Sequence, residues 1–332
     1  MSNHVSIVGA GVAGLTAAME LVTRGLDVTI YEQSTEIGAH ACSRYAGGML
    51  APWCERESAE EEVVTLGREA ADWWEEQTGL VVRNGSLVVA KGRDRSELRR
   101  FAARTSNYAE VDAIQVADLE PDLEGRFQLG LHFSEEAHLD PRKAIAKLAA
   151  RLEETGVSFE LGEPVDPQDL GGTVIDARGF AAQSSLKELR GVKGEMLLLH
   201  CPDVSLNRPI RMLHPRIPLY IVPRADGIFM VGATMIESSE RGRVTARSVL
   251  ELLGSAYALH PAFAEAEIVE MGVDVRPSYP DNLPRVTQSG TIISINGLYR
   301  HGFLLSPAMA RIASDMIAGT TFSSEARHAH HA

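Results

Sequence analysis

The sequence predicts a mixed α/β (α+β) fold, in which a Rossmann-like nucleotide-binding domain is interleaved with an antiparallel-sheet domain. Three observations carry this prediction. The chain opens with a strand, glycine turn, helix and strand; elements of the same type return in its middle and near its end; and residues 194–235 alternate and are rich in β-formers. The length of 332 residues suits about two domains.

The N-terminal unit is a βαβ nucleotide fingerprint. Residues 5–8 are a β-rich run, residues 9–14 fit G-x-G-x-x-G, the helix that follows should end at Gly25, and a second strand ends at Glu32. The first glycine allows the tight turn, the second lets the backbone approach a pyrophosphate, and the third lets helix and strand pack closely. The helix N-terminus would face the phosphates, and the acid would bind a ribose.

Two further helices are read from their end signals. Residues 57–79 form one predicted helix, with a capping box made by Ser58 and Glu61 and with Gly79 after its last turn. Asp140 precedes a proline, which predicts that it caps the N-terminus of another helix.

The remaining elements return to the nucleotide-binding pattern. Residues 157–161 and 174–179 are predicted strands, and the second of them runs into a glycine turn. A last strand covers residues 291–294, and a final helix is expected to have Ser306 as its N-cap and Pro307 as its first residue.

Because the two kinds of element alternate along the chain, each domain is expected to be discontinuous. The nucleotide-binding domain is assigned to residues 1–56, 135–193 and 270–324, and the antiparallel-sheet domain to residues 57–134 and 194–269. Residues 325–332 look like a disordered, histidine-rich tail.

Composition excludes several classes of function. The formal net charge of -13, from 45 acidic and 32 basic residues, argues against nucleic-acid binding and against a polybasic membrane surface. The uncharged stretch 5–19 is too short to span a bilayer and has no basic lead-in, so neither an anchor nor a signal peptide is expected. The three cysteines form no Cys-x-x-Cys pair, which predicts reduced thiols in a cytoplasmic protein and no metal site.

Several segments spread along the chain match one known family. They are residues 43–50, 220–224, 231–235, 272–277, 280–284 and 297–302. Together with the N-terminal fingerprint they resemble the D-amino-acid-oxidase family of FAD-dependent oxidoreductases over nearly the whole chain. Residues 47–55, Gly-Gly-Met-Leu-Ala-Pro-Trp-Cys-Glu, look most like the glycine oxidases of thiamine biosynthesis.

The resemblance implies FAD as the cofactor. The single dinucleotide fingerprint agrees, because it leaves no obvious second site for a nicotinamide. Some relatives tether the flavin to a cysteine near Arg276, but no cysteine follows Cys201, so non-covalent binding is expected. The resemblance places Val165 at the adenine, and beside it the chain is shorter than its relatives. The implied cofactor-binding residues are Gly9, Gly11, Val12, Ala13, Gly14, Glu32, Gln33, Ser43, Arg44, Gly47, Gly48, Met49, Val165, Gly179, Arg300, His301, Gly302, Phe303 and Leu304.

Arg276 is the leading candidate for substrate binding. A guanidinium matches a carboxylate bidentately, and the resemblance places an Arg of this motif on the substrate carboxylate; the alternative is a structural ion pair. Tyr220 matches a tyrosine that binds the same carboxylate, although it could equally be a core aromatic. The resemblance also places Arg300, Met49 and Met235 at the substrate, with Arg276, Tyr220 and Arg300 as the catalytic set.

His301 and Pro218 each lie close in sequence to a predicted substrate residue, and their roles are open. His301 is a tempting base, but its neighbours favour a cofactor-lining role, and no base is needed if the amine arrives deprotonated. Pro218 stands where some relatives carry a histidine near the substrate, which leaves fine substrate preference open.

The expected activity is oxidation of glycine to its imine, with hydride transfer to FAD and reduction of O2 to H2O2. In this family the imine supplies the thiazole of thiamine. Alternatives are an oxidase or dehydrogenase of sarcosine, D-proline or other D-amino acids, and an FAD-bound redox sensor without turnover. The partners are then a small amino acid and O2, and the chain could form a homo-oligomer.

Overall fold

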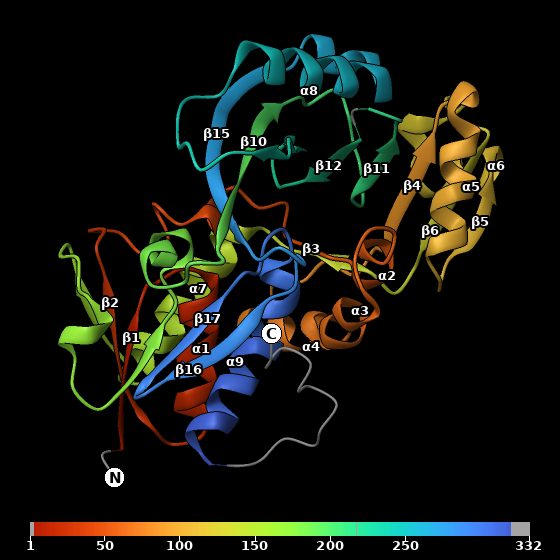
Figure 1. The fold of residues 1–332 in the computed structure, drawn as a ribbon. Helices are drawn as coiled ribbons and strands as arrows, with labels where there is room; N and C mark the ends of the chain where they lie inside the picture. Colours follow the sequence, from red (N-terminus) through yellow and green to blue (C-terminus); the bar gives the residue numbers. More distant parts are fainter. Residues whose placement is uncertain (1–2, 217, 320–332) are drawn as a thin grey trace.

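The computed structural model describes residues 3–216 and 218–319. Its chain builds two large sheets joined by long strands (Figure 1). The predicted tail 325–332 lies outside the described residues. Within the described part, no helix is long and apolar enough to cross a membrane.

The first sheet is the predicted nucleotide-binding sheet. Five of its six strands are parallel, and β16 pairs with β17 in the antiparallel direction. In spatial order the strands are β16 (Arg285–Ser289), β17 (Ile292–Asn296), β9 (Thr173–Asp176), β1 (His4–Val8), β2 (Asp27–Glu32) and β8 (Ser158–Leu161). The strands predicted at 5–8, 157–161, 174–179 and 291–294 are therefore confirmed, with small shifts at their ends.

The second sheet is mixed but mostly antiparallel. The neighbouring pairs among β10 to β13 run antiparallel, as predicted for residues 194–235, whereas β4 joins β11 in parallel. Its strands in order are β14 (Ile236–Glu237), β10 (Arg190–His200), β13 (Ile228–Gly232), β12 (Leu219–Pro223), β11 (Ile210–Leu213), β4 (Ser86–Ala90), β6 (Leu129–Phe133) and β5 (Ala109–Asp112), with β15 (Glu267–Ser278) beside β10. A small third sheet pairs β3 (Met49–Leu50) with β7 (Ala137–His138).

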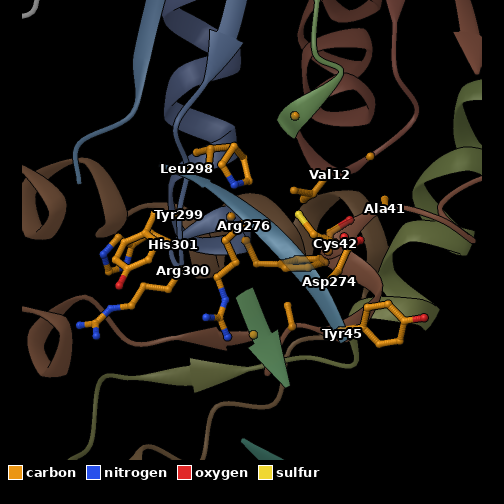
Figure 2. A pocket seen from close by; sticks show the side chains of 18 of the residues that line it. Val12, Ala41, Cys42, Tyr45, Asp274, Arg276, Leu298, Tyr299, Arg300 and His301 are labelled. Atoms are coloured by element: carbon orange, nitrogen blue, oxygen red, sulfur yellow. The ribbon is translucent and has the colours of Figure 1, made fainter. Parts of the chain in front are cut away.

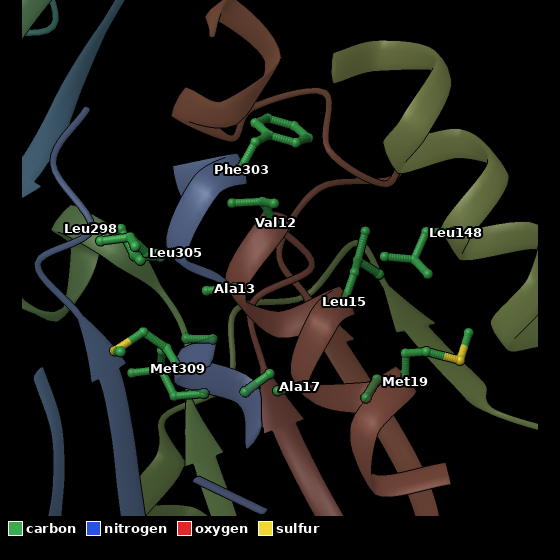
Figure 3. Close-up of a cluster of buried hydrophobic side chains, with 14 of the residues drawn as sticks. Val12, Ala13, Leu15, Ala17, Met19, Leu148, Leu298, Phe303, Leu305 and Met309 are labelled. Atoms are coloured by element: carbon green, nitrogen blue, oxygen red, sulfur yellow. The ribbon is translucent and has the colours of Figure 1, made fainter. Parts of the chain in front are cut away.

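Helices cover both sheets. The core of the first sheet forms where α1 and α9 cross, and it includes the side chains of Leu15, Leu148, Phe303 and Met309 (Figure 3). The second sheet carries α8, whose Leu252 and Leu259 lie in a separate apolar cluster. The helices are α1 (Val12–Thr23), α2 (Pro52–Glu55), α3 (Glu61–Gly67), α4 (Ala70–Thr78), α5 (Arg95–Arg104), α6 (Ala113–Leu119), α7 (Pro141–Glu154), α8 (Ala246–Leu259) and α9 (Gly302–Ile317).

Several predicted helix ends are confirmed. Gly25 and Gly79 both adopt positive φ just after α1 and α4, at 77° and 65°. Glycine adopts this left-handed conformation at little cost, which suits the end of a helix. The Asp140 side chain accepts the Arg142 N–H at 3.0 Å and so caps α7 as predicted.

Two predicted helix starts are wrong. The single helix expected over 57–79 is two helices, α3 and α4, and α3 begins at Glu61 without the capping box, because Ser58 Oγ instead accepts from Arg300 Nη2. The last helix begins four residues before Ser306, at Gly302, so Pro307 lies inside α9. Helices α3 and α4 pack on α9 with the first sheet, although residues 57–134 are assigned above to the other domain; the domain division stays a prediction.

Candidate active site

A long cavity of about 480 Å³ extends from the glycine turn after β1 to the inner face of the second sheet. This volume lies within the range of small-molecule and cofactor sites. Figure 2 shows Arg276 near its centre, with Arg300 and His301 on one side and Cys42 and Asp274 on the other. Of the predicted site residues, all except Gly14 and Arg44 line the cavity.

The glycine turn has the shape that a pyrophosphate needs. Gly9 has φ of 107°, and a Cβ at Gly14 would lie 1.9 Å from the Gly9 carbonyl oxygen. Gly14 therefore acts by close packing and not by lining the cavity. Beside the turn, Ser43 Oγ is buried and has no hydrogen-bond partner among the described residues. A cradle without side chains and a free buried hydroxyl both fit a bound phosphate.

Glu32 lies at the end of the cavity beside the glycine turn. Its carboxylate accepts two backbone N–H groups, from Ala10 at 2.8 Å and from Ser34 at 3.0 Å. Each carboxylate oxygen keeps a further lone pair, so the group can still accept from a ribose hydroxyl. Gln33 and Val165 line the same end.

Hydrogen bonds from Arg224 hold the loop at Gly47 and Gly48. The Arg224 guanidinium donates to the carbonyl oxygens of Gly47 at 2.8 Å and Leu139 at 2.9 Å. Burial lowers the pKa of Arg224 to about 10, which leaves the side chain charged at neutral pH. Gly48 has φ of 71°, and a Cβ there would lie 2.2 Å from the Leu139 oxygen, so only glycine fits. The loop thus brings bare backbone to the cavity.

The other wall is formed by the N-terminus of α9. Gly302, Phe303 and Leu304 line the cavity, and the first N–H groups of a helix have no partners within the helix. A helix N-terminus favours negative charge, so this wall suits an anionic group. The preceding His301 is only 3% exposed, and burial lowers its pKa to about 4, so the imidazole is neutral at pH 7.

Arg276 differs from the other arginines of the cavity. Its Nη1 donates to the Thr234 carbonyl oxygen at 3.0 Å, and no carboxylate of the described residues lies within 4 Å of its guanidinium. Arg211 and Arg300, in contrast, are paired with Glu55. A guanidinium without a carboxylate partner in a cavity is free to bind one. The structural ion pair that was the alternative for Arg276 is absent among the described residues.

The other predicted substrate residues line the same cavity. The Tyr220 ring packs on Gly47 and Gly232, and burial raises the pKa of its phenol. Met235 Sδ lies 3.6 Å from Arg300 Nη1, and Met49 lines the cavity nearby.

Arg44 is a predicted cofactor-binding residue that the structure places outside the cavity lining. Its carbonyl oxygen accepts from Arg142 Nε at 3.3 Å.

Glu55 and Arg211 are among the charged residues of the cavity that sequence reasoning missed. Glu55 ends the segment that carries the resemblance, but it was given no role. Arg211 lies in β11, 156 residues further along the chain, and its Nη2 donates to Glu55 Oε1. Glu55 Oε2 lies 3.0 Å from Arg300 Nη2 and 3.3 Å from His301 Nδ1. Burial raises the pKa of Glu55, but the two guanidinium groups outweigh it, and the net pKa is well below its usual range.

Comparison with known proteins agrees with this geometry. The family model described as FAD dependent oxidoreductase (DAO) matches residues 4–316. A protein of Rhizobium etli, provisionally named thiamine biosynthesis oxidoreductase ThiO, is 58% identical over 308 residues, covering 92% of this chain and 94% of the relative. The glycine oxidase of Pseudomonas aeruginosa is 28% identical, with 96% of each chain covered.

Solved structures of related proteins share the fold. The glycine oxidase of Geobacillus kaustophilus superposes with a TM-score of 0.81 at 24% identity, covering 96% of this chain and 95% of its own. The iminodiacetate oxidase of Chelativorans sp. BNC1 superposes with a TM-score of 0.79 at 24% identity, covering 98% of each chain. The chain therefore belongs to the DAO family of FAD-dependent oxidoreductases.

Proposed function

We propose that the protein is a glycine oxidase, which converts glycine to its imine and then to glyoxylate while O2 is reduced to H2O2. The observation that carries this proposal is the Arg276 guanidinium, which lies in the cavity beside Tyr220 with no carboxylate partner among the described residues. The names of the Rhizobium etli and Pseudomonas aeruginosa relatives support the substrate and the link to thiamine biosynthesis. We also propose a cytoplasmic, non-covalent FAD enzyme.

Bound FAD supplies the hydride acceptor for amine oxidation. The residues of this chain bind and orient. Arg276 and Tyr220 hold the substrate carboxylate, and Arg300 adds a second cation beside it. Met49 and Met235 also line the cavity, and we propose that they contact the rest of the amino acid. His301 is neutral at pH 7, so it adds no positive charge beside the substrate amine. We propose that the amine arrives deprotonated, so that no side chain is needed as a base.

The test is an anaerobic titration of the yellow holoenzyme with glycine, followed by admission of air. Glycine should bleach the oxidised flavin band, and air should restore it with release of peroxide. Arg276→Ala should weaken glycine binding by about 30-fold or more, because the carboxylate loses its charged partner. Arg311→Ala is the matched control, since Arg311 pairs with Glu69 at the surface, 2.6 Å away.

Each alternative has its own result. Bleaching that air does not reverse indicates a dehydrogenase with another acceptor. Bleaching by sarcosine or D-proline but not by glycine removes the glycine and thiamine assignments and keeps the Arg276 site. A flavin that no amine reduces favours a redox sensor.

A further inference from the structure

The short helix α2 carries Glu55 into the cavity. Glu55 is 8% exposed, and its carboxylate joins Arg211 of β11 to Arg300 of the loop before α9. Arg300 also donates to Ser58, so its guanidinium is fixed on two sides by the chain around α2. The direction of Arg300 in the cavity therefore depends on where α2 sits.

A second buried carboxyl holds α2 from behind. Glu136 is 1% exposed and precedes β7, and its Oε1 accepts the Cys54 N–H at 2.7 Å. The residue before α2 is Ala51, which has no side-chain oxygen to accept an N–H. Glu136 supplies the missing acceptor from 82 residues further along the chain. A hydrogen bond from a backbone N–H to an ionised carboxylate is stronger than one between neutral groups.

The charge of the same carboxyl also acts on Arg211, without an ion pair within 4 Å among the described residues. Arg211 feels the charge of both Glu55 and Glu136. Glu136 Oε2 and Arg211 Nε are both buried and have no hydrogen-bond partner among the described residues. Such atoms cost free energy to bury. The Ser86 hydroxyl also stabilises the ionised form of Glu136.

We propose that Glu136 is a positioning residue for substrate binding: it fixes α2 through the Cys54 N–H, and α2 holds Glu55 against Arg300. This inference rests on the proposed function, because it takes the substrate to be a carboxylate bound at Arg276 and Arg300. Glu136 is not among the residues that line the cavity, so it acts through α2.

The proposal predicts a pH dependence. Burial raises the pKa of Glu136 to about 6, against the opposing effects of Arg211 and the Cys54 N–H. The other titratable groups around it stay in one form between pH 5 and 8. Burial raises the pKa of the Cys54 thiol well above its usual value, the Glu55 pKa lies well below its own, and burial lowers the pKa of His138 and His301 to about 4. Protonation of Glu136 below pH 6 should therefore loosen α2.

The experiment measures the Kd of glycolate for the holoenzyme by calorimetry from pH 5 to pH 8. Glycolate has the carboxylate of glycine without its amine, and it is ionised across this range. For the unaltered protein we expect Kd to rise about 10-fold from pH 8 to pH 5 with a midpoint near 6, since small misplacements of binding groups have effects of this size or larger. Glu136→Gln should bind weakly at every pH, with no midpoint.

Two further variants separate positioning from folding. Glu136→Asp keeps the charge but shortens the side chain, so it should weaken glycolate binding even at pH 8. Glu120→Gln is the matched control, because Glu120 is also fully buried but bonds Asn207 and Arg208, away from the cavity. It should lower the melting temperature and leave the glycolate profile unchanged.

The outcomes are distinct. A Kd for the unaltered protein that is constant from pH 5 to pH 8 overturns the proposal, even if Glu136→Gln does not fold. So does a Glu136→Gln protein with unaltered affinity and midpoint. If glycolate binds tightly but ignores Glu136, only the positioning role fails. If glycolate does not bind at any pH, the carboxylate site of the proposed function fails with it.

Discussion

At the scale of single residues, the direction of Arg276 is decided by an absent side chain. A Cβ at Gly194 would lie 2.4 to 2.8 Å from three atoms of the Arg276 guanidinium. Both residues belong to the β10–β15 pair, in which Gly194 faces Asp274, two residues from Arg276. The guanidinium thus packs directly on the backbone of β10 while it lines the cavity.

We predict that Gly194→Ala displaces Arg276 and raises the Kd of glycolate by about 10- to 100-fold. Gly254→Ala is the matched control, because a Cβ there meets nothing within 4 Å and alanine favours the helix α8. Calorimetry with both variants measures the effect, and melting curves show whether Gly194→Ala stays folded. A folded Gly194→Ala protein with unchanged affinity would contradict this placement of Arg276.

Site residues whose spacing has a single physical explanation could be identified from the sequence alone. The glycines of the turn after β1 were recognisable because their spacing has a physical reason, and Gly9 and Gly14 have the expected geometry. Glu55 and Arg211 could not be paired in advance. They lie 156 residues apart on different elements, and no local spacing brings them together. The roles assigned to Arg276 and Tyr220 remain predictions until binding is measured.

At the scale of elements, α9 shows how packing overrides a sequence signal. Pro307 suggested a helix start, yet it lies inside α9. Proline has no N–H, so the Phe303 carbonyl four residues earlier loses its usual partner. The Trp74 indole N–H donates to that carbonyl at 2.8 Å instead. The helix can therefore begin at Gly302, which is what brings its N-terminus to the cavity.

We predict that Trp74→Phe lowers the free energy of unfolding by about 1–3 kcal/mol, because the buried Phe303 carbonyl loses its donor. Trp73→Phe is the control. The Trp73 indole bonds the Glu20 carboxylate in a half-buried position, where water can replace it, so the loss should be smaller. Denaturant titrations of both proteins make the comparison. Equal losses would show that the Phe303 carbonyl needs no side-chain donor.

Strands were easier to predict than helix starts. The β-rich runs around β1, β9 and β17 are short and buried, so their composition alone identified them. The Ser58 capping pattern failed, because Ser58 Oγ is used by Arg300, which is 242 residues away. A cap depends on whether its oxygen is free, and a distant residue decides that.

At the scale of the molecule, the cavity runs from one sheet to the other. Its walls include Glu32 at the end of β2 and Arg211 in β11 of the second sheet. The strands β10 and β15 lead from the second sheet toward the first (Figure 1), and Arg276 lies on β15. A ligand that fills the whole cavity would therefore bind elements of both sheets at once.

We predict that FAD raises the melting temperature of the flavin-free protein far more than FMN does. A ligand at 100 times its Kd stabilises the folded state by about 2.7 kcal/mol. FMN lacks the adenosine half that the Glu32 end of the cavity would hold, so its Kd should be much higher. Gly11→Val tests whether the cofactor passes the glycine turn. Gly11 lines the cavity, and a Cβ there would have only Ala41 at 3.5 Å and Ser43 at 3.9 Å nearby, so a valine side chain fits the protein but occupies the space of the ligand. The variant should melt close to the unaltered flavin-free protein and should lose the FAD shift. If FMN stabilises as strongly as FAD, the Glu32 end takes no part in binding the cofactor.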